Sequence, residues 1–298
     1  MSVRTPAALA ATVAAVLAMS ACAGGGSAST EDLGTESNPV RLGVVGASEP
    51  YWATYTEAVA EAGISLELVD FTDYNQPNPA VSEGELDLNQ FQHIIYLANY
   101  NVQAGDDLVP IGSTATYPLG LYSTQYGSVE EIPDGAQVAV PNDNTNQARG
   151  LLILQSAGLI TLAEGGGPFS TVADVVAEES RVEVLALDAA VTATSLPDVA
   201  AAIINNDFIT DAGLTEEDAI AQDDPADPSA FPYINIFATT AENAENEVLA
   251  DLVEIYQTTP EVTDGVVEAS GGTAVLTQTP VADLVDSLAD VEADIEAQ

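Results

Sequence analysis

Short β-rich runs alternate with helical segments from residue 40 onward, and this alternation restricts the possible folds more than any other feature. Residues 40–46 form a β-rich run that ends in glycine, residues 51–62 have the pattern of a helix that Gly63 closes, and residues 66–71 predict a second strand. Strand, helix and strand at this spacing are typical of βαβ units with parallel strands. The sequence therefore predicts an α/β fold whose sheets are mainly parallel and flanked by helices.

The same pattern continues to the end of the chain. We expect strands at residues 109–112, 120–123, 137–141, 182–187 and 233–237, and helices at 79–84, 145–157, 199–204, 248–258 and 281–297. Gly158 follows the helix at 145–157 as a C-cap, and the last helix is amphipathic and acidic. No repeat of fixed period is visible, so the chain is α/β throughout.

Charge and residue usage exclude several kinds of function. The 298 residues include 47 acidic and four basic ones, all arginine, yet 47% are hydrophobic, which is enough for a core. Nucleic-acid binding needs clustered Lys and Arg and is therefore excluded. One cysteine and one histidine exclude an internal disulfide and a Cys/His metal cluster. No catalytic motif is visible, and the acidic loop at 223–227 is interpreted as solvated, so we expect no enzyme, no metal and no cofactor.

The first 39 residues predict a lipid anchor and a tether. Residues 1–21 have a weakly positive start, an apolar stretch and small residues before a cysteine, as in a bacterial lipoprotein signal peptide. Cys22 would receive the lipid, although Met19 stands where such signals usually have leucine; the alternative is an ordinary signal peptide. Residues 22–39, rich in Gly, Ala, Ser and Thr after the cysteine, predict a flexible tether. The folded part is expected to begin at residue 40.

Three clusters of polar and aromatic residues are candidates for a binding site. They cover residues 71–78, 89–97 and 140–149, and two of them directly follow a predicted strand. In open α/β sheets the ligand lies beyond the carboxyl ends of the strands. Arg149 lies about five residues into the predicted helix, so we expect its guanidinium and the free backbone N–H groups of that helix to meet a carboxylate together.

The motifs in these clusters resemble those of the methionine-binding lipoprotein (MetQ/NlpA-type) family of ABC-transporter substrate-binding proteins. Four of them occur in the family's order between about residues 40 and 275: Asp73-Tyr74-x-x-Pro77-Asn78, Asn89-x-Phe91-Gln92-His93-x-x-Tyr96-Leu97, Val138-Ala139-Val140-Pro141-Asn142-Asp143-x-Thr145-Asn146-x-x-Arg149 and Pro232-Tyr233-Ile234-Asn235. The resemblance implies a two-lobed periplasmic-binding-protein fold, type II-like, with the ligand in the cleft between the lobes. It places lobe 1 at residues 40–117, lobe 2 at 118–235, and the return part of lobe 1 with an acidic C-terminal helix at 236–298.

The resemblance also implies which residues bind the ligand. The positions that contact the amino and carboxylate groups are matched by Asn146, Asn205, Asn235 and Arg149. The aromatic wall around a thioether side chain is matched by Tyr74, Phe91, His93 and Tyr96, and sulfur gains stability beside aromatic rings. One departure is Asp207, which stands where the family tends to carry a second asparagine.

These expectations describe a monomeric, lipid-anchored protein on the outer face of the cytoplasmic membrane. It would capture L- or D-methionine and deliver it to the permease and ATPase subunits of an ABC importer. One alternative is a different small ligand, such as a methionine peptide or another apolar amino acid. Another is a surface lipoprotein that has lost ligand binding. Arg149 and its neighbouring asparagines argue against this second alternative, because an empty cleft has no use for a buried guanidinium.

Overall fold

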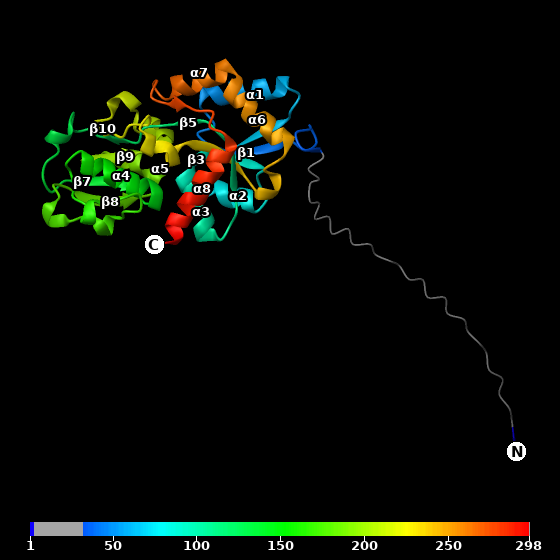
Figure 1. Cartoon of the computed structure of the whole chain (residues 1–298), viewed down its shortest axis with the longest axis horizontal. Helices are drawn as coiled ribbons and strands as arrows, with labels where there is room; N and C mark the ends of the chain where they lie inside the picture. The colour runs from blue at the N-terminus through cyan, green and yellow to red at the C-terminus, as the bar shows by residue number, and fades with distance from the viewer. Residues whose placement is uncertain (3–31, 298) are drawn as a thin grey trace.

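The computed structural model describes residues 1–2 and 32–297, and residues 32–297 form two α/β lobes side by side (Figure 1). The sheet of the first lobe has the strand order β2-β1-β3-β11-β4 and contains β1 (Val40–Val45), β2 (Leu66–Phe71), β3 (Leu88–His93), β4 (Val109–Ser113) and β11 (Asn235–Thr239). The sheet of the second lobe has the order β10-β6-β9-β7-β8 and contains β6 (Gly120–Tyr122), β7 (Gln137–Pro141), β8 (Glu183–Leu187), β9 (Ala201–Ile204) and β10 (Ala221–Gln222).

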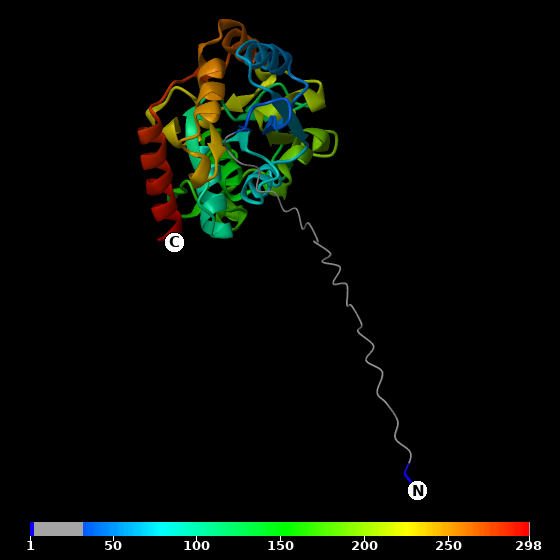
Figure 2. The ribbon, with the colours of Figure 1, turned by 90° about the vertical axis from the view of Figure 1, so that its right-hand side faces the viewer.

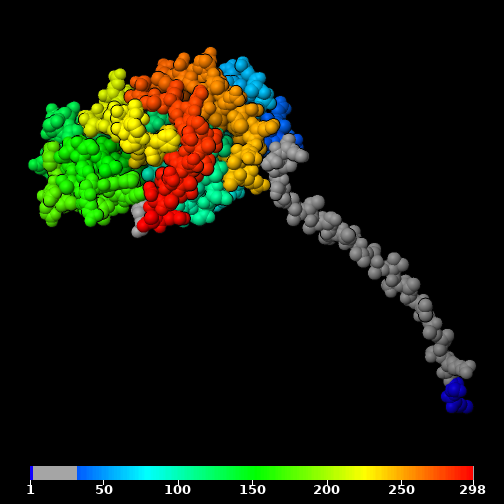
Figure 3. Space-filling model, in the orientation of Figure 1, coloured from blue at the N-terminus to red at the C-terminus, as the bar shows by residue number. Residues whose placement is uncertain are grey.

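Helices cover both sheets (Figure 2). Those of the first lobe are α1 (Pro50–Glu61), α2 (Pro77–Ser82), α3 (Ile94–Ala104), α6 (Glu247–Thr258), α7 (Pro260–Ala269) and α8 (Val281–Glu296). Those of the second lobe are α4 (Asn144–Ser156) and α5 (Ala189–Thr192). The space-filling view shows α8 lying across one face of the first lobe (Figure 3), where Leu284 and Leu288 join an apolar cluster with residues of α3. The α/β fold predicted from the sequence is confirmed.

Strand pairing is more mixed than the sequence predicts. Within the described residues, each large sheet has two parallel and two antiparallel strand pairs. The expectation of mainly parallel sheets is therefore wrong in this detail. In the first sheet the physical reason lies in β11, which returns from the second lobe and inserts antiparallel between β3 and β4. A strand that arrives in this way is not joined to its neighbours by the helical crossover that makes strands parallel.

The chain passes between the lobes twice. The first passage follows β5 (Ala115–Thr116), which pairs with β12 (Val275–Leu276), and leads to β6. The second connects β10 to β11, whose first residue is Asn235. A cluster of buried side chains joins the lobes between these passages, with Tyr74 and Phe91 on one side and Ala139 and Phe208 on the other.

Residues 199–204, which the sequence predicts as a helix, instead contain strand β9. This strand lies inside the second sheet between β6 and β7, and all four of its residues are buried. A strand covered on both faces is a continuous apolar run without alternation, so it resembles a short helix in sequence. The strand predicted at 233–237 also begins later than expected. Tyr233 belongs to a 3-10 helix, and β11 begins two residues after it.

The fold begins before residue 40. Leu33 is 9% exposed and belongs to the same apolar cluster as Val40 and Trp52. The Ser65 N–H donates to the Gly34 carbonyl at 2.7 Å, and Gly34 has a φ of +84° close to Val248. The flexible tether predicted for residues 22–39 is therefore wrong from residue 32 onward, because the packing of Leu33 and the backbone bond between Gly34 and Ser65 fix this segment to the core.

The predicted signal peptide at residues 1–21 and the predicted lipidation site Cys22 lie outside the described residues, apart from residues 1–2. None of the described helices combines the length and the apolar character needed to cross a membrane.

Candidate functional site

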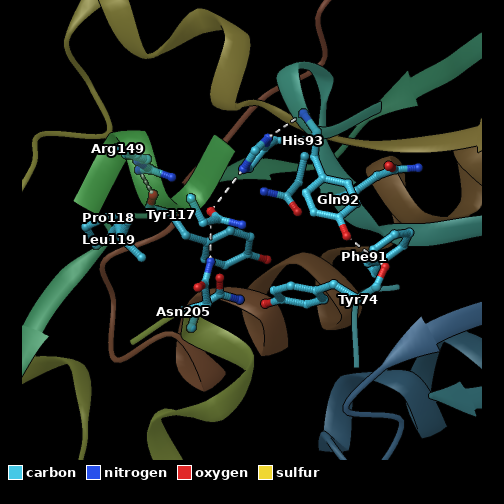
Figure 4. Close-up of a pocket in the computed structure, with 13 residues that line it drawn as sticks. Tyr74, Phe91, Gln92, His93, Tyr117, Pro118, Leu119, Arg149 and Asn205 are labelled. Carbon is cyan, nitrogen blue, oxygen red and sulfur yellow. Dashed lines mark hydrogen bonds between the residues drawn. The ribbon is translucent and has the colours of Figure 1, made fainter. Parts of the chain in front are cut away.

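A pocket lies between the two lobes and has a cavity volume of about 20 Å³ (Figure 4). All eight residues that the sequence predicts for the site line it: Tyr74, Phe91, His93, Tyr96, Asn146, Arg149, Asn205 and Asn235. Five further residues were not predicted as site residues: Gln92, Tyr117, Pro118, Leu119 and Asn206. Three of these belong to the first passage between the lobes, where no motif marks them as pocket residues.

His93 presents a neutral ring to the pocket. It ends β3 and caps α3, and its Nδ1 accepts the Tyr96 N–H at 3.1 Å. That bond places the ring hydrogen on Nε2, which donates to the Asn146 Oδ1 at 3.3 Å. Burial, and then the nearby Arg149 guanidinium, lower the pKa of His93 to about 3. The ring therefore stays uncharged at neutral pH and offers a flat surface rather than a proton.

Asn146 orients its neighbours. Its Oδ1 accepts hydrogen bonds from His93 and, at 3.0 Å, from the Asn205 Nδ2. Its Nδ2 donates to both carboxylate oxygens of Asp143, at 3.1 and 3.2 Å. The amide was expected to contact the ligand, but protein groups already occupy both of its ends. In the structure this amide holds His93 and Asn205 in place through two hydrogen bonds.

Asn205 has one polar atom free. Its Oδ1 is buried and has no hydrogen-bond partner among the described residues, and the whole residue is 7% exposed. Leaving such an oxygen unpaired costs about 1–3 kcal/mol. Figure 4 shows Asn205 at the pocket, linked by dashed lines through an intervening amide toward His93. An N–H donor on a bound molecule would satisfy this oxygen.

Arg149 lies on α4 and is already paired with a carboxylate. Its Nε donates to the Asp223 Oδ2 at 2.6 Å, and its Nη2 donates to the Asp223 Oδ1 at 3.1 Å and to the Tyr117 carbonyl at 2.8 Å. The guanidinium carbon lies 4.3 Å from the centre of the Tyr233 ring. Nη1 is the guanidinium nitrogen that no hydrogen bond within the described residues occupies.

The expected meeting of a bound carboxylate with both Arg149 and the start of the helix stays a prediction, and protein carboxylates occupy part of both groups of donors. Asp143 caps α4 and accepts the Asn146 N–H at 2.9 Å, so that amide is occupied. The two-pronged contact to Arg149 is made by Asp223, which the sequence interpretation left as a solvated loop residue. A bound carboxylate would have Nη1 to contact.

Aromatic rings form the opposite, apolar end of the pocket. The centre of the Tyr74 ring lies 5.8 Å from that of Phe91, 6.1 Å from that of Tyr96 and 5.1 Å from that of Phe208. The hydroxyl of Tyr96 donates to the Tyr74 carbonyl at 3.0 Å. The hydroxyl of Tyr74 donates to the Asp207 Oδ2 at 2.7 Å, which joins the first lobe to the second. Both hydroxyls are thus satisfied, and the rings leave an apolar surface.

Asn235 lies where β11 begins, next to His93 on β3. Its carbonyl accepts the Thr114 N–H at 2.8 Å, which fixes the backbone at this corner of the pocket. In the described residues, no group of three or more His, Cys, Asp and Glu side chains is arranged to hold a metal ion.

Two α/β lobes, connected by two passages and enclosing a pocket with one polar and one aromatic end, define the class of two-lobed substrate-binding proteins. Within that class, the chain belongs to the NlpA lipoprotein family, whose family model matches residues 40–277. The family resemblance inferred from the four motifs is confirmed.

Similar proteins agree with this assignment. The chain is 40% identical over 226 residues to the probable D-methionine-binding lipoprotein MetQ of Vibrio cholerae, a match of 75% of this chain and 82% of the Vibrio protein. Its fold is similar to that of the substrate-binding protein of a methionine transporter from Streptococcus pneumoniae, with 36% identity and a TM-score of 0.74 over 80% of this chain and 95% of the other. A nutrient-binding protein from Burkholderia cenocepacia bound to methionine matches with 35% identity and a TM-score of 0.73 over 80% and 99% of the two chains.

Proposed function

We propose that this protein binds methionine in the pocket between its lobes and delivers it to an ABC importer. The observation that carries the proposal is the division of one pocket into two chemically different ends. The aromatic end suits a thioether, because sulfur beside aromatic rings gains about 0.3–1.5 kcal/mol per contact. The polar end has a free oxygen on Asn205 and a free nitrogen on Arg149, which suit an ammonium and a carboxylate.

The rest of the proposed role follows from this binding. Closure of two lobes around a small molecule is how such proteins present it to a membrane permease. We propose that a permease and an ATPase encoded elsewhere are the partners, and that the protein acts as a monomer without catalytic activity. A lipid on Cys22 would hold it at the outer face of the cytoplasmic membrane.

Calorimetric titration of residues 23–298 tests the proposal. This chain keeps every described helix and strand, and it is unfolded and refolded first to remove retained ligand. L-methionine, D-methionine, glycyl-methionine and leucine are compared. We expect sub-micromolar binding of at least one methionine form and none of leucine. Absence of binding across the panel contradicts the proposed function and leaves the fold unaffected.

The substitution Arg149→Ala tests the polar end. Losing a buried charged partner of the ligand is expected to weaken methionine binding by about 2–5 kcal/mol. Arg181→Ala is the matched control, because Arg181 pairs with the exposed Asp134 on the surface of the second lobe. The same titration measures both variants, and circular dichroism confirms that they remain folded. Equal affinity of Arg149→Ala and the wild type would exclude Arg149 from ligand binding.

A further inference from the structure

Asp223 is held in one position beside the pocket. It lies just after β10, and its carboxylate makes the two-pronged contact with Arg149. Its Oδ1 also accepts the Leu119 N–H at 2.8 Å, and its own N–H donates to the Leu119 carbonyl at 3.3 Å. The side chain of Arg149 is 7% exposed and that of Asp223 is 27% exposed. Arg149 lines the pocket and Asp223 holds its guanidinium in place, so the pair is a built feature and not a loose surface contact.

The pair removes the positive charge from the pocket. Arg149 is the pocket's cationic side chain, and His93 beside it is neutral. Unpaired, a guanidinium shielded from water would attract any anion of suitable size, because charges interact strongly where water is excluded. Asp223 cancels this charge, while Nη1 remains available as a hydrogen-bond donor. A pocket of this kind has no net attraction for a ligand that carries only a negative charge.

We propose that Asp223 determines the charge selectivity of the pocket: by neutralising Arg149 it makes the site accept a zwitterionic amino acid and reject an anion that has the same side chain but no amino group. The proposal rests on the proposed function, since it assumes that methionine binds here. It adds a mechanism of discrimination that works by withholding attraction from the wrong ligand. The 223–227 loop, interpreted from sequence as merely solvated, then supplies a specificity-determining residue.

Three ligands that share one side chain and differ in their charged groups test this role. They are methionine, 4-(methylsulfanyl)butanoate, which lacks the amino group, and 3-(methylsulfanyl)propylamine, which lacks the carboxylate. The variant is Asp223→Asn, because an amide oxygen still accepts the Leu119 N–H while the charge is lost. The control is Asp224→Asn, since the adjacent Asp224 is exposed, loses the same charge and does not contact Arg149.

The readout is the ratio of the butanoate affinity to the methionine affinity, measured by calorimetry on residues 23–298. We expect this ratio to rise tenfold or more in Asp223→Asn and to change less than twofold in Asp224→Asn. The amine is expected to bind Asp223→Asn less well than the wild type. If Asp223→Asn has a low Tm, the ratio is read from the Tm shift that each ligand produces, and Asp223→Ser is measured beside it.

Two results overturn the proposal. One is an unchanged ratio, including the case in which both ligands bind Asp223→Asn more tightly by the same factor, because Asp223 would then only compete with the ligand for Arg149. The other is butanoate that still fails to bind Asp223→Asn at millimolar concentration. Failure of the wild type to bind methionine is a separate result, and it contradicts the proposed function itself.

Discussion

Most polar side chains of the pocket are engaged with one another. Asp143, Asn146, His93 and Asn205 form a continuous chain of hydrogen bonds, and Arg149 is fixed by Asp223. Such a chain, which joins His93 of the first lobe to Asn146 of the second, holds ring and amide orientations in place while the lobes are together. Asn205 Oδ1 and Arg149 Nη1 are among the polar atoms that remain for a ligand to contact.

The tautomer of His93 is a testable consequence of this chain. Because burial lowers the pKa of His93 to about 3, we expect the ring to stay neutral, with its hydrogen on Nε2, from pH 8 to pH 5. NMR of the imidazole nitrogens measures this directly, and His93 is the one histidine in the sequence. Its contribution to stability should fall as the pH drops below about 6.5, where the unfolded chain takes up a proton and the folded chain does not. A titration midpoint near 6.5 in the folded protein would contradict the hydrogen-bond assignment.

The sequence predicts the pocket residues well and their interactions poorly, for a physical reason. Tyr74, His93 and Arg149 lie within motifs whose neighbours along the chain mark them. The Arg149–Asp223 contact joins positions far apart in sequence, and nothing near Asp223 distinguishes it from the other 46 acidic residues. Phe208 joins the aromatic wall from the second lobe without any motif of its own.

Elements with a clear local signal are also predicted closely. Strands β2 and β7 and helix α6 lie within a residue of their predicted bounds, because turn residues or caps flank them. The segment at 199–204 was missed because only the neighbouring strands decide that it is extended. Helices α3 and α7 were not predicted, and α7 begins at Pro260 directly after the last residue of α6 and its cap.

Packing of β4 against α6 predicts the effect of adding one methyl group. A Cβ at Gly112 would lie 2.2 Å from the Val253 Cγ1, inside a core that has no room for it. We expect Gly112→Ala to lower the free energy of unfolding by about 1–3 kcal/mol. The control is Gly127→Ala, where the nearest atom is 3.6 Å away on the flexible side chain of Glu131. Urea unfolding compares them, and equal midpoints would show that the strand and helix are less tightly packed than described.

At the scale of the whole molecule, polar contacts join two lobes that each carry their own core. Tyr74 reaches Asp207 across the cleft, and His93 reaches Asn146. Two further contacts, Asn75 with Asp188 and Asn144 with Asn99, are long at 3.4 Å and exposed. With a formal net charge of −43, mutual repulsion between the lobes opposes closure and is weakened by salt. The buried contacts therefore decide how closure depends on conditions.

The raised pKa of Asp207 predicts that the folded protein gains stability in mild acid. Removal from water raises the pKa of Asp207 to about 7, with the nearby Glu49 adding to the rise and the Tyr74 hydroxyl opposing it. Because the free carboxyl titrates near 3.9, the folded protein holds an extra proton between about pH 4 and pH 7, and the stability this gives is lost as the pH rises through 7. The difference in unfolding free energy between the wild type and Asp207→Asn should therefore shift in favour of the wild type as the pH falls from 8 to 5, by at most about 1.4 kcal/mol for each pH unit below 7. The amide of Asp207→Asn still accepts the Tyr74 hydroxyl, so the variant removes only the charge. Urea unfolding is measured at each pH in 1 M salt, because the salt screens the surface carboxylates. Parallel pH profiles for the two proteins would mean that Asp207 titrates as an ordinary surface acid and would contradict its raised pKa.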